Sequence, residues 1–101
     1  MIVYNITIRI NPEIEPDWLQ WQKEEHIPEI MATGMFTEYR FFRLLDPMEE
    51  DGITYVIQYF ALSYENYSGY IDEAAPTLRQ KAMEKWGDKF IAFRTVMEVV
   101  N

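Results

Sequence analysis

The alternating stretch Ile2–Ile10 constrains the fold of this chain more than any other segment. Every second residue is large and apolar: Ile2, Tyr4, Ile6, Ile8 and Ile10. A period of two residues places these side chains on one face of a β-strand. The stretch has no basic start and no unbroken apolar core, so we expect a strand and not a signal peptide. A strand with one apolar face needs a second layer of structure to cover it.

A helix and a β-hairpin follow in the sequence. Pro16 suits the first turn of a helix, which we expect to begin near that residue and to end at Gly34. Residues 35–45 and 53–62 are rich in aromatic and β-branched side chains, as strands are. The acidic, turn-forming sequence at residues 46–52 joins them and predicts an antiparallel hairpin.

A second helix and a fourth strand complete the pattern. Ser63 is a candidate N-cap, apolar residues then recur at three- and four-residue spacing, and Gly87 can end the helix. Pro76 should bend this helix or split it. Residues 89–100 have the composition of a last strand. The order βαββαβ with right-handed crossovers predicts an α+β ferredoxin-like sandwich, a four-stranded antiparallel sheet with two helices on one face, and residues 1–101 as a single domain.

The predicted strands are apolar on both faces. Residues 35–45, for example, place on one face Tyr39 and Phe41, and on the other Phe36, Phe42 and Leu44. Two helices can cover only one face of a four-stranded sheet, and an uncovered apolar face promotes association. We therefore expect a homodimer in which the second faces of two sheets meet, as in an α/β barrel.

The composition excludes several classes of partner and site. With 17 acidic and 9 basic side chains the net charge is −8, so we expect binding neither to nucleic acid nor to an anionic membrane surface. No apolar run is long enough to cross a bilayer. The absence of cysteine excludes disulfides and zinc–thiolate sites and favours the cytoplasm. A single histidine, His26, without a ligand motif predicts no metal site and no cofactor, and haem ligation is set aside for the same reason.

The first predicted helix carries the residues best suited to a ligand site. At 100° per residue its apolar stripe includes an amide, a carboxylate and the histidine: Trp18, Leu19, Trp21, Gln22, Glu25 and His26. Two indole rings beside polar groups are typical of a pocket for an apolar or planar molecule, so Trp18, Trp21 and Gln22 are candidate ligand-binding residues. Arg94 in the last strand either holds a ligand carboxylate, pairs across the dimer interface, or only solvates or pairs within the sheet.

Two interpretations of His26 follow from the sequence. In the first, His26 is a general acid or base, Gln22 orients it, and Glu25 supplies a second carboxyl whose pKa is raised by partial burial. In the second, His26 is a core residue that bonds a backbone carbonyl freed by Pro28, which should kink or end the helix beside it. The helix dipole favours the charged imidazole and burial favours the neutral form.

Three segments spread along the chain resemble those of a known group of proteins. They are Met1–Thr7, the run Trp-Leu-Gln-Trp-Gln with Glu25-His26-Ile27-Pro28, and Ala92–Thr95. They are similar to a family of short bacterial proteins known as a domain of unknown function. That family lies in the dimeric α/β barrel group with antibiotic biosynthesis monooxygenases, muconolactone isomerase, stress-responsive A/B barrel proteins and haem-degrading monooxygenases.

The resemblance implies a ferredoxin-like fold, a homodimer and a small-molecule cleft between the first helix and the sheet. It leaves two functions open. One is a non-enzymatic module that binds a small molecule or another protein. The other is a cofactor-independent monooxygenase- or isomerase-like enzyme that acts on a small apolar or aromatic substrate, with His26 as acid or base.

Overall fold

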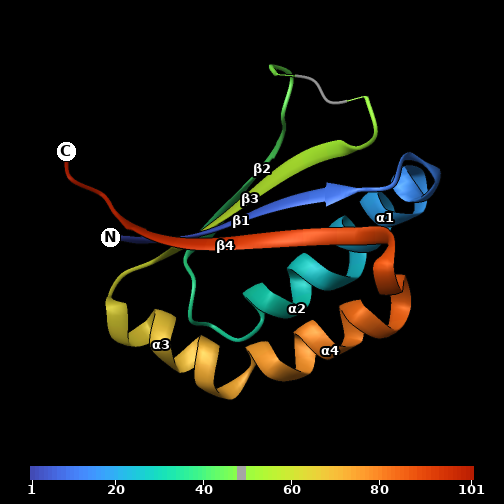
Figure 1. Cartoon of the computed structure of the whole chain (residues 1–101). Coiled ribbons are helices and arrows are strands. Elements are labelled where there is room, and N and C mark those ends of the chain that lie inside the picture. The colour runs from blue at the N-terminus through green and yellow to red at the C-terminus, as the bar shows by residue number, and fades with distance from the viewer. Residues whose placement is uncertain (48–49) are drawn as a thin grey trace.

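The computed structural model describes residues 1–47 and 50–101, and its single antiparallel sheet carries all the helices on one side (Figure 1). The sheet order is β2-β3-β1-β4, with bounds β1 (Ile2–Ile10), β2 (Glu38–Arg43), β3 (Ile53–Ala61) and β4 (Phe90–Glu98). Every strand pairing is antiparallel. The predicted ferredoxin-like sandwich and its β2–β3 hairpin are confirmed. Residues 48 and 49 of the predicted turn lie outside the described residues.

The first helical region contains a widened turn. It consists of η1 (Pro12–Ile14), α1 (Glu15–Trp21), η2 (Gln22–His26) and α2 (Ile27–Met31). In η2 the bonding is π-helical, and the Ile27 N–H donates to the carbonyl of Gln22, five residues earlier. Pro28 has no N–H for the carbonyl of Glu24, which accounts for the local change of register. The helix was expected to kink or to end beside His26. It does not end there, because the chain continues directly into α2, but its regular α-helical bonding is interrupted over Gln22–His26.

The second helical region is split as predicted. It comprises α3 (Tyr64–Glu73), α4 (Ala75–Trp86) and the single turn η3 (Gly87–Lys89). Ser63 caps α3, since its side chain accepts a hydrogen bond from the Asn66 N–H at 3.2 Å. Pro76 lies in the first turn of α4, where a missing N–H costs nothing. No helix in the described part of the chain is long and apolar enough to cross a bilayer.

The core lies between the sheet and the helices. The alternate residues of β1 and β3 that face the helices are buried, whereas the opposite face of β3 is only half-buried. Phe36 corrects one expectation. It precedes β2, so the alternation does not reach it, and its ring packs in the core against Tyr4, Tyr59 and Tyr70. The predicted placement of Phe36 beside Phe42 is therefore wrong.

The face of the sheet away from the helices is uncovered and apolar. The exposed large side chains on it include Phe42, Ile91, Phe93 and Met97. Ile91 is 56% exposed and Phe93 is 64% exposed. An ordered strand with side chains of this kind in water is a feature of surfaces that associate.

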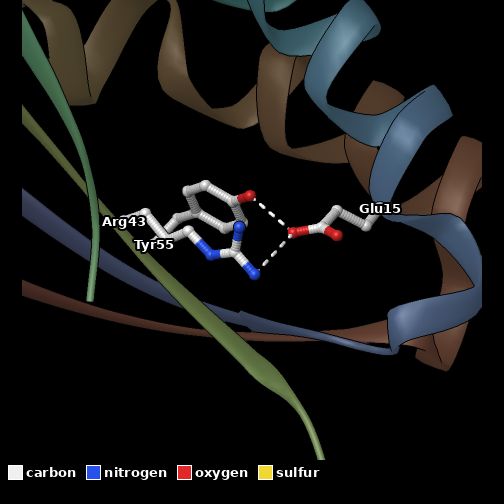
Figure 2. Close-up of polar contacts among 3 residues, drawn as sticks. All are labelled: Glu15, Arg43 and Tyr55. Carbon is white, nitrogen blue, oxygen red and sulfur yellow. Dashed lines mark hydrogen bonds and ion pairs between the residues drawn. The ribbon is translucent and has the colours of Figure 1, made fainter. Parts of the chain in front are cut away.

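A polar contact ties the start of α1 to the sheet (Figure 2). The Tyr55 hydroxyl donates a hydrogen bond of 2.6 Å to Glu15 Oε2, and Arg43 Nη2 lies 3.6 Å from the same oxygen. Burial and the bond to Glu15 raise the pKa of Tyr55 to about 12. Because Tyr55 is in β3 and Arg43 in β2, this contact fixes the first helix over the two strands and so positions the tryptophans that follow it.

Candidate functional site

An internal cavity lies between the first helical region, α4 and the sheet. It offers about 40 Å³ to water-sized molecules, room for roughly two or three waters. Its wall contains all three tryptophans of the chain, Trp18, Trp21 and Trp86. The floor is formed by isoleucines of β1 and β3, and β4 closes one side with Phe90, Ala92 and Arg94.

Five of the six residues predicted to form a site line this cavity: Trp18, Trp21, Gln22, His26 and Arg94. The sixth, Glu25, is solvent-exposed and lines an outer groove together with Asp17 and Glu24, on the far side of Trp21 and Trp86, which line both spaces. The expected partial burial of the Glu25 carboxyl is therefore wrong.

The π-helical turn explains why, of the two, His26 lines the cavity and Glu25 does not. Counted at 100° per residue, Glu25 falls close to the line of Trp18. A π turn contains one residue more than an α turn, so every later side chain is set back around the axis by about one position. His26 consequently takes the place on the inner face that an uninterrupted α-helix would give to Glu25.

His26 is held by a ring stack. Its imidazole lies 4.4 Å from the Trp21 ring, between centroids, with 19° between the planes. Burial lowers the pKa of His26 to about 4; the charge of Glu29 opposes this shift, and Arg94 and Lys81 add to it. Burial therefore decides the charge state, and the imidazole is neutral at pH 7.

The predicted contact between Gln22 and His26 is replaced by another arrangement. Gln22 is 2% exposed, and its Oε1 has no hydrogen-bond partner within the described part of the chain. The stack on Trp21 therefore orients His26, and the amide oxygen of Gln22 stays available to a molecule in the cavity.

The cavity collects buried polar atoms that have no partner. Within residues 1–47 and 50–101 these atoms are Gln22 Oε1, Tyr59 OH, Arg79 Nε and Trp86 Nε1, and all four residues line the cavity. Arg79 is anchored at its other end, where Nη2 donates to the Tyr4 hydroxyl at 3.0 Å. Buried polar groups are nearly always hydrogen-bonded, so four unpaired polar atoms around one space indicate that water or a ligand fills the space.

Three of these residues were not predicted from the sequence to be site residues. Tyr59 and Trp86 have the pattern of ordinary core residues, and they become site residues only through their unpaired polar atoms. Arg79 gave a usable signal, because it lies three and seven residues before Ala82 and Trp86, and so on the inward face of α4. A charged residue within an apolar helical stripe is worth testing as a site residue.

A wider groove adjoins the cavity on the side of α4 and β4. It has a volume of about 290 Å³ and shares with the cavity Arg79, Ala82, Phe90, Ala92 and Arg94. Met83 lines only the groove. The wall that the two spaces share carries apolar side chains and the two arginines.

The site residues do not fit a metal or a haem. In the part of the chain that the structure describes, no three acidic or histidine side chains are placed to hold a metal ion. The cavity beside His26, about 40 Å³, is far smaller than the 300–1,000 Å³ typical of sites for drug-sized ligands, so a porphyrin has no room there.

Comparison with known proteins places the chain in a family. The model of the family described as "Domain of unknown function (DUF4286)" matches residues 1–100. The chain belongs to this family. No curated protein matches this DUF4286 chain at a significant level.

Solved structures share its fold at low sequence identity. An ethyl tert-butyl ether D (EthD) family protein from Bacillus halodurans is 16% identical, with a TM-score of 0.76, and the match covers 99% of this chain and 100% of that one. The haem-degrader MhuD from Mycobacterium tuberculosis is 14% identical (TM-score 0.67, covering 100% and 97%). SnoaB, a cofactor-independent oxygenase from Streptomyces nogalater, is 9% identical (TM-score 0.64, covering 99% and 94%). Other matching structures are described as dimeric ferredoxin-like proteins.

Proposed function

We propose that this DUF4286 chain binds a small molecule in the cavity between the first helical region, α4 and the sheet. The observation that carries the proposal is the set of four buried, unpaired polar atoms around one space. Leaving such an atom unsatisfied costs about 1–3 kcal/mol, so a ligand that satisfies several of them gains the corresponding free energy. Much of the remaining wall is aromatic, with Trp18, Trp21 and Trp86, and the space of about 40 Å³ admits only a small group, so a larger ligand body has to lie outside it.

The three tryptophans provide the test. A ¹H–¹⁵N spectrum of the protein contains only three indole N–H resonances, and all three come from the cavity wall. A library of neutral, cationic and anionic fragments should contain members that shift these resonances. Ala82→Leu, which adds bulk inside the cavity, should weaken every such fragment, whereas Thr77→Leu on the exposed side of α4 should not. A library without a single member that shifts an indole resonance would overturn the proposal.

A second candidate function is acid–base catalysis by His26 in a cofactor-independent enzyme of the monooxygenase or isomerase type. It is favoured by the neutral state of an imidazole that lines the cavity, since a free lone pair can accept a proton from a bound substrate. A base with a pKa of about 4 is weak, so the substrate would need an acidic proton. His26→Gln should retain binding of a ligand found in the screen and abolish its conversion, as followed by mass spectrometry. Conversion at the wild-type rate would exclude this role.

The proposed assembly is a homodimer in which the uncovered sheet faces of two copies meet. It is supported by the exposed Phe42, Ile91, Phe93 and Met97, and by the similar structures described as dimeric. The cavity lies on the opposite face of the sheet, so dimerisation leaves it accessible. Sedimentation velocity should report a single dimeric species, and a monomer at micromolar concentration would contradict the assembly.

Residues 1–101 are proposed to act as one domain in a reducing compartment such as the cytoplasm. Support comes from the family match over residues 1–100 and from the absence of cysteine. Fractionation of cells that express the tagged protein tests the location.

A further inference from the structure

We infer that the natural occupant of the cavity is a small organic carboxylate, whose oxygens accept hydrogen bonds from Arg79 and Trp86 and whose apolar body lies in the groove between α4 and β4. This inference rests on the proposed binding function and names the chemical class of its ligand.

The unpaired atoms select an acceptor. Arg79 Nε and Trp86 Nε1 are donors only, and neither has a partner in the described part of the chain. The Tyr59 hydroxyl, on a fully buried residue, can donate as well. A carboxylate offers two oxygens with several lone pairs, so one group can satisfy these donors together.

Gln22 Oε1 adds a different requirement. It is an acceptor, so it needs a donor beside the carboxylate. A hydroxyl group on the ligand or one of the few waters that the cavity can hold would satisfy it.

The charge of the cavity wall opposes that of the whole chain. The protein carries a net charge of −8, yet the described lining of the cavity contains two arginines, Arg79 and Arg94, and no carboxylate. The nearby Glu29, whose charge acts on His26, is held by Lys81 at 2.8 Å on the outside. Since His26 is neutral, the two arginines set the sign of the local potential, which attracts an anion.

Size and shape favour a carboxylate on an apolar body. The inner space of about 40 Å³ matches a group of a few heavy atoms, and the adjoining groove of about 290 Å³ has room for a ring or a short chain. Met83, Phe90 and Ala92 line that groove. A free inorganic anion would leave this apolar surface without a partner.

Matched pairs of probes test the inference. Benzoate and its neutral isostere benzamide, and hexanoate with hexanamide, are titrated into ¹⁵N-labelled protein, with the Trp86 indole N–H as the reporter. Each carboxylate should bind roughly tenfold more tightly than its amide, as expected for a charge-assisted contact. Arg94→Gln, on an exposed position of β4, should reduce that difference, because it removes one of the two positive charges of the cavity wall. Arg79→Lys, which keeps the charge and removes Nε, should weaken the carboxylate and reduce the shift of the Trp86 resonance.

Lys23→Gln is the matched control, because Lys23 is exposed, lies outside the described cavity lining, and its loss changes the net charge of the chain by the same amount. It should leave the affinity for benzoate unchanged. Equal binding of acid and amide, or equal effects of Arg94→Gln and Lys23→Gln, would overturn the carboxylate assignment. If the fragment library gives ligands but neither benzoate nor hexanoate nor their amides bind, the carboxylate assignment fails and the proposed binding function stands. If the library gives none, the proposed binding function itself fails.

Discussion

His26 makes the stability of this protein depend on pH in a predictable direction. Its pKa is about 4 in the folded chain and 6.5 when unperturbed, mainly because burial disfavours the charged ring. Well above pH 6.5 His26 is neutral in both the folded and the unfolded state, so it contributes nothing to the pH dependence there. As the pH falls from 6.5 to 4, the unfolded chain takes up the proton first, so the folded state loses stability. At about 1.4 kcal/mol for each pKa unit, the full penalty below pH 4 is about 3 kcal/mol.

The assay compares the wild type with His26→Gln by urea unfolding at fixed protein concentration between pH 7.5 and 4. Carboxylates titrate in both proteins, so the difference between the two free energies of unfolding isolates the only histidine. Loss of the stack on Trp21 adds an offset that does not depend on pH. Between pH 7.5 and 4 the free energy of unfolding of the wild type should fall by about 3 kcal/mol more than that of His26→Gln. A constant difference, or a His26 ring proton that titrates in the folded protein near 6.5, would refute the reasoning.

Three further predictions follow from named contacts. Phe93→Asp puts a charge on the uncovered sheet face and should convert the proposed dimer to a monomer in sedimentation velocity; a variant that is dimeric would place the interface elsewhere. Tyr55→Phe removes the hydrogen bond to Glu15 and should lower the free energy of unfolding by roughly 2 kcal/mol, and an unchanged urea midpoint would show that the bond contributes nothing. Gly34→Ala, at φ +76°, should destabilise the protein by about 1 kcal/mol. Gly69→Ala lies inside α3, where the added Cβ meets Met35 only at an ordinary 3.5 Å, and should stabilise the protein by roughly 0.5–1 kcal/mol. Equal effects of the two substitutions would contradict the backbone argument.

The fold was predictable because each segment of the chain has a clear period. The alternation in Ile2–Ile10 fixes a strand and its buried face, and Ser63 and Pro76 mark where α3 begins and where the second helical region divides. Phe36 shows where this reasoning stops. Alternation holds only inside a strand, and β2 begins two residues later at Glu38, so the backbone between them is free to turn Phe36 into the core.

The site was predictable as far as one helix could reveal it. Trp18, Trp21 and Gln22 follow the helical period and do line the cavity. The exposed position of Glu25 depends on a π turn, which a count at 100° per residue does not contain. Pro28 was the available signal, since a proline within a helical pattern must displace some backbone hydrogen bond.

The other half of the site comes from distant parts of the chain. Tyr59 is in β3, Arg79 and Trp86 are in α4, and only the packing of α4 across the sheet brings them to His26. Their unpaired polar atoms are a property of the folded state. No local pattern of apolar residues contains that information.

A crystal structure of the protein soaked with 4-bromobenzoate tests the central claim most directly, because the anomalous signal of bromine locates the ring. The carboxylate should lie within hydrogen-bond distance of Arg79 Nε and Trp86 Nε1, with the bromine toward Met83 in the groove. Ordered waters bridging the four polar atoms, with the probe absent or bound elsewhere, would contradict it.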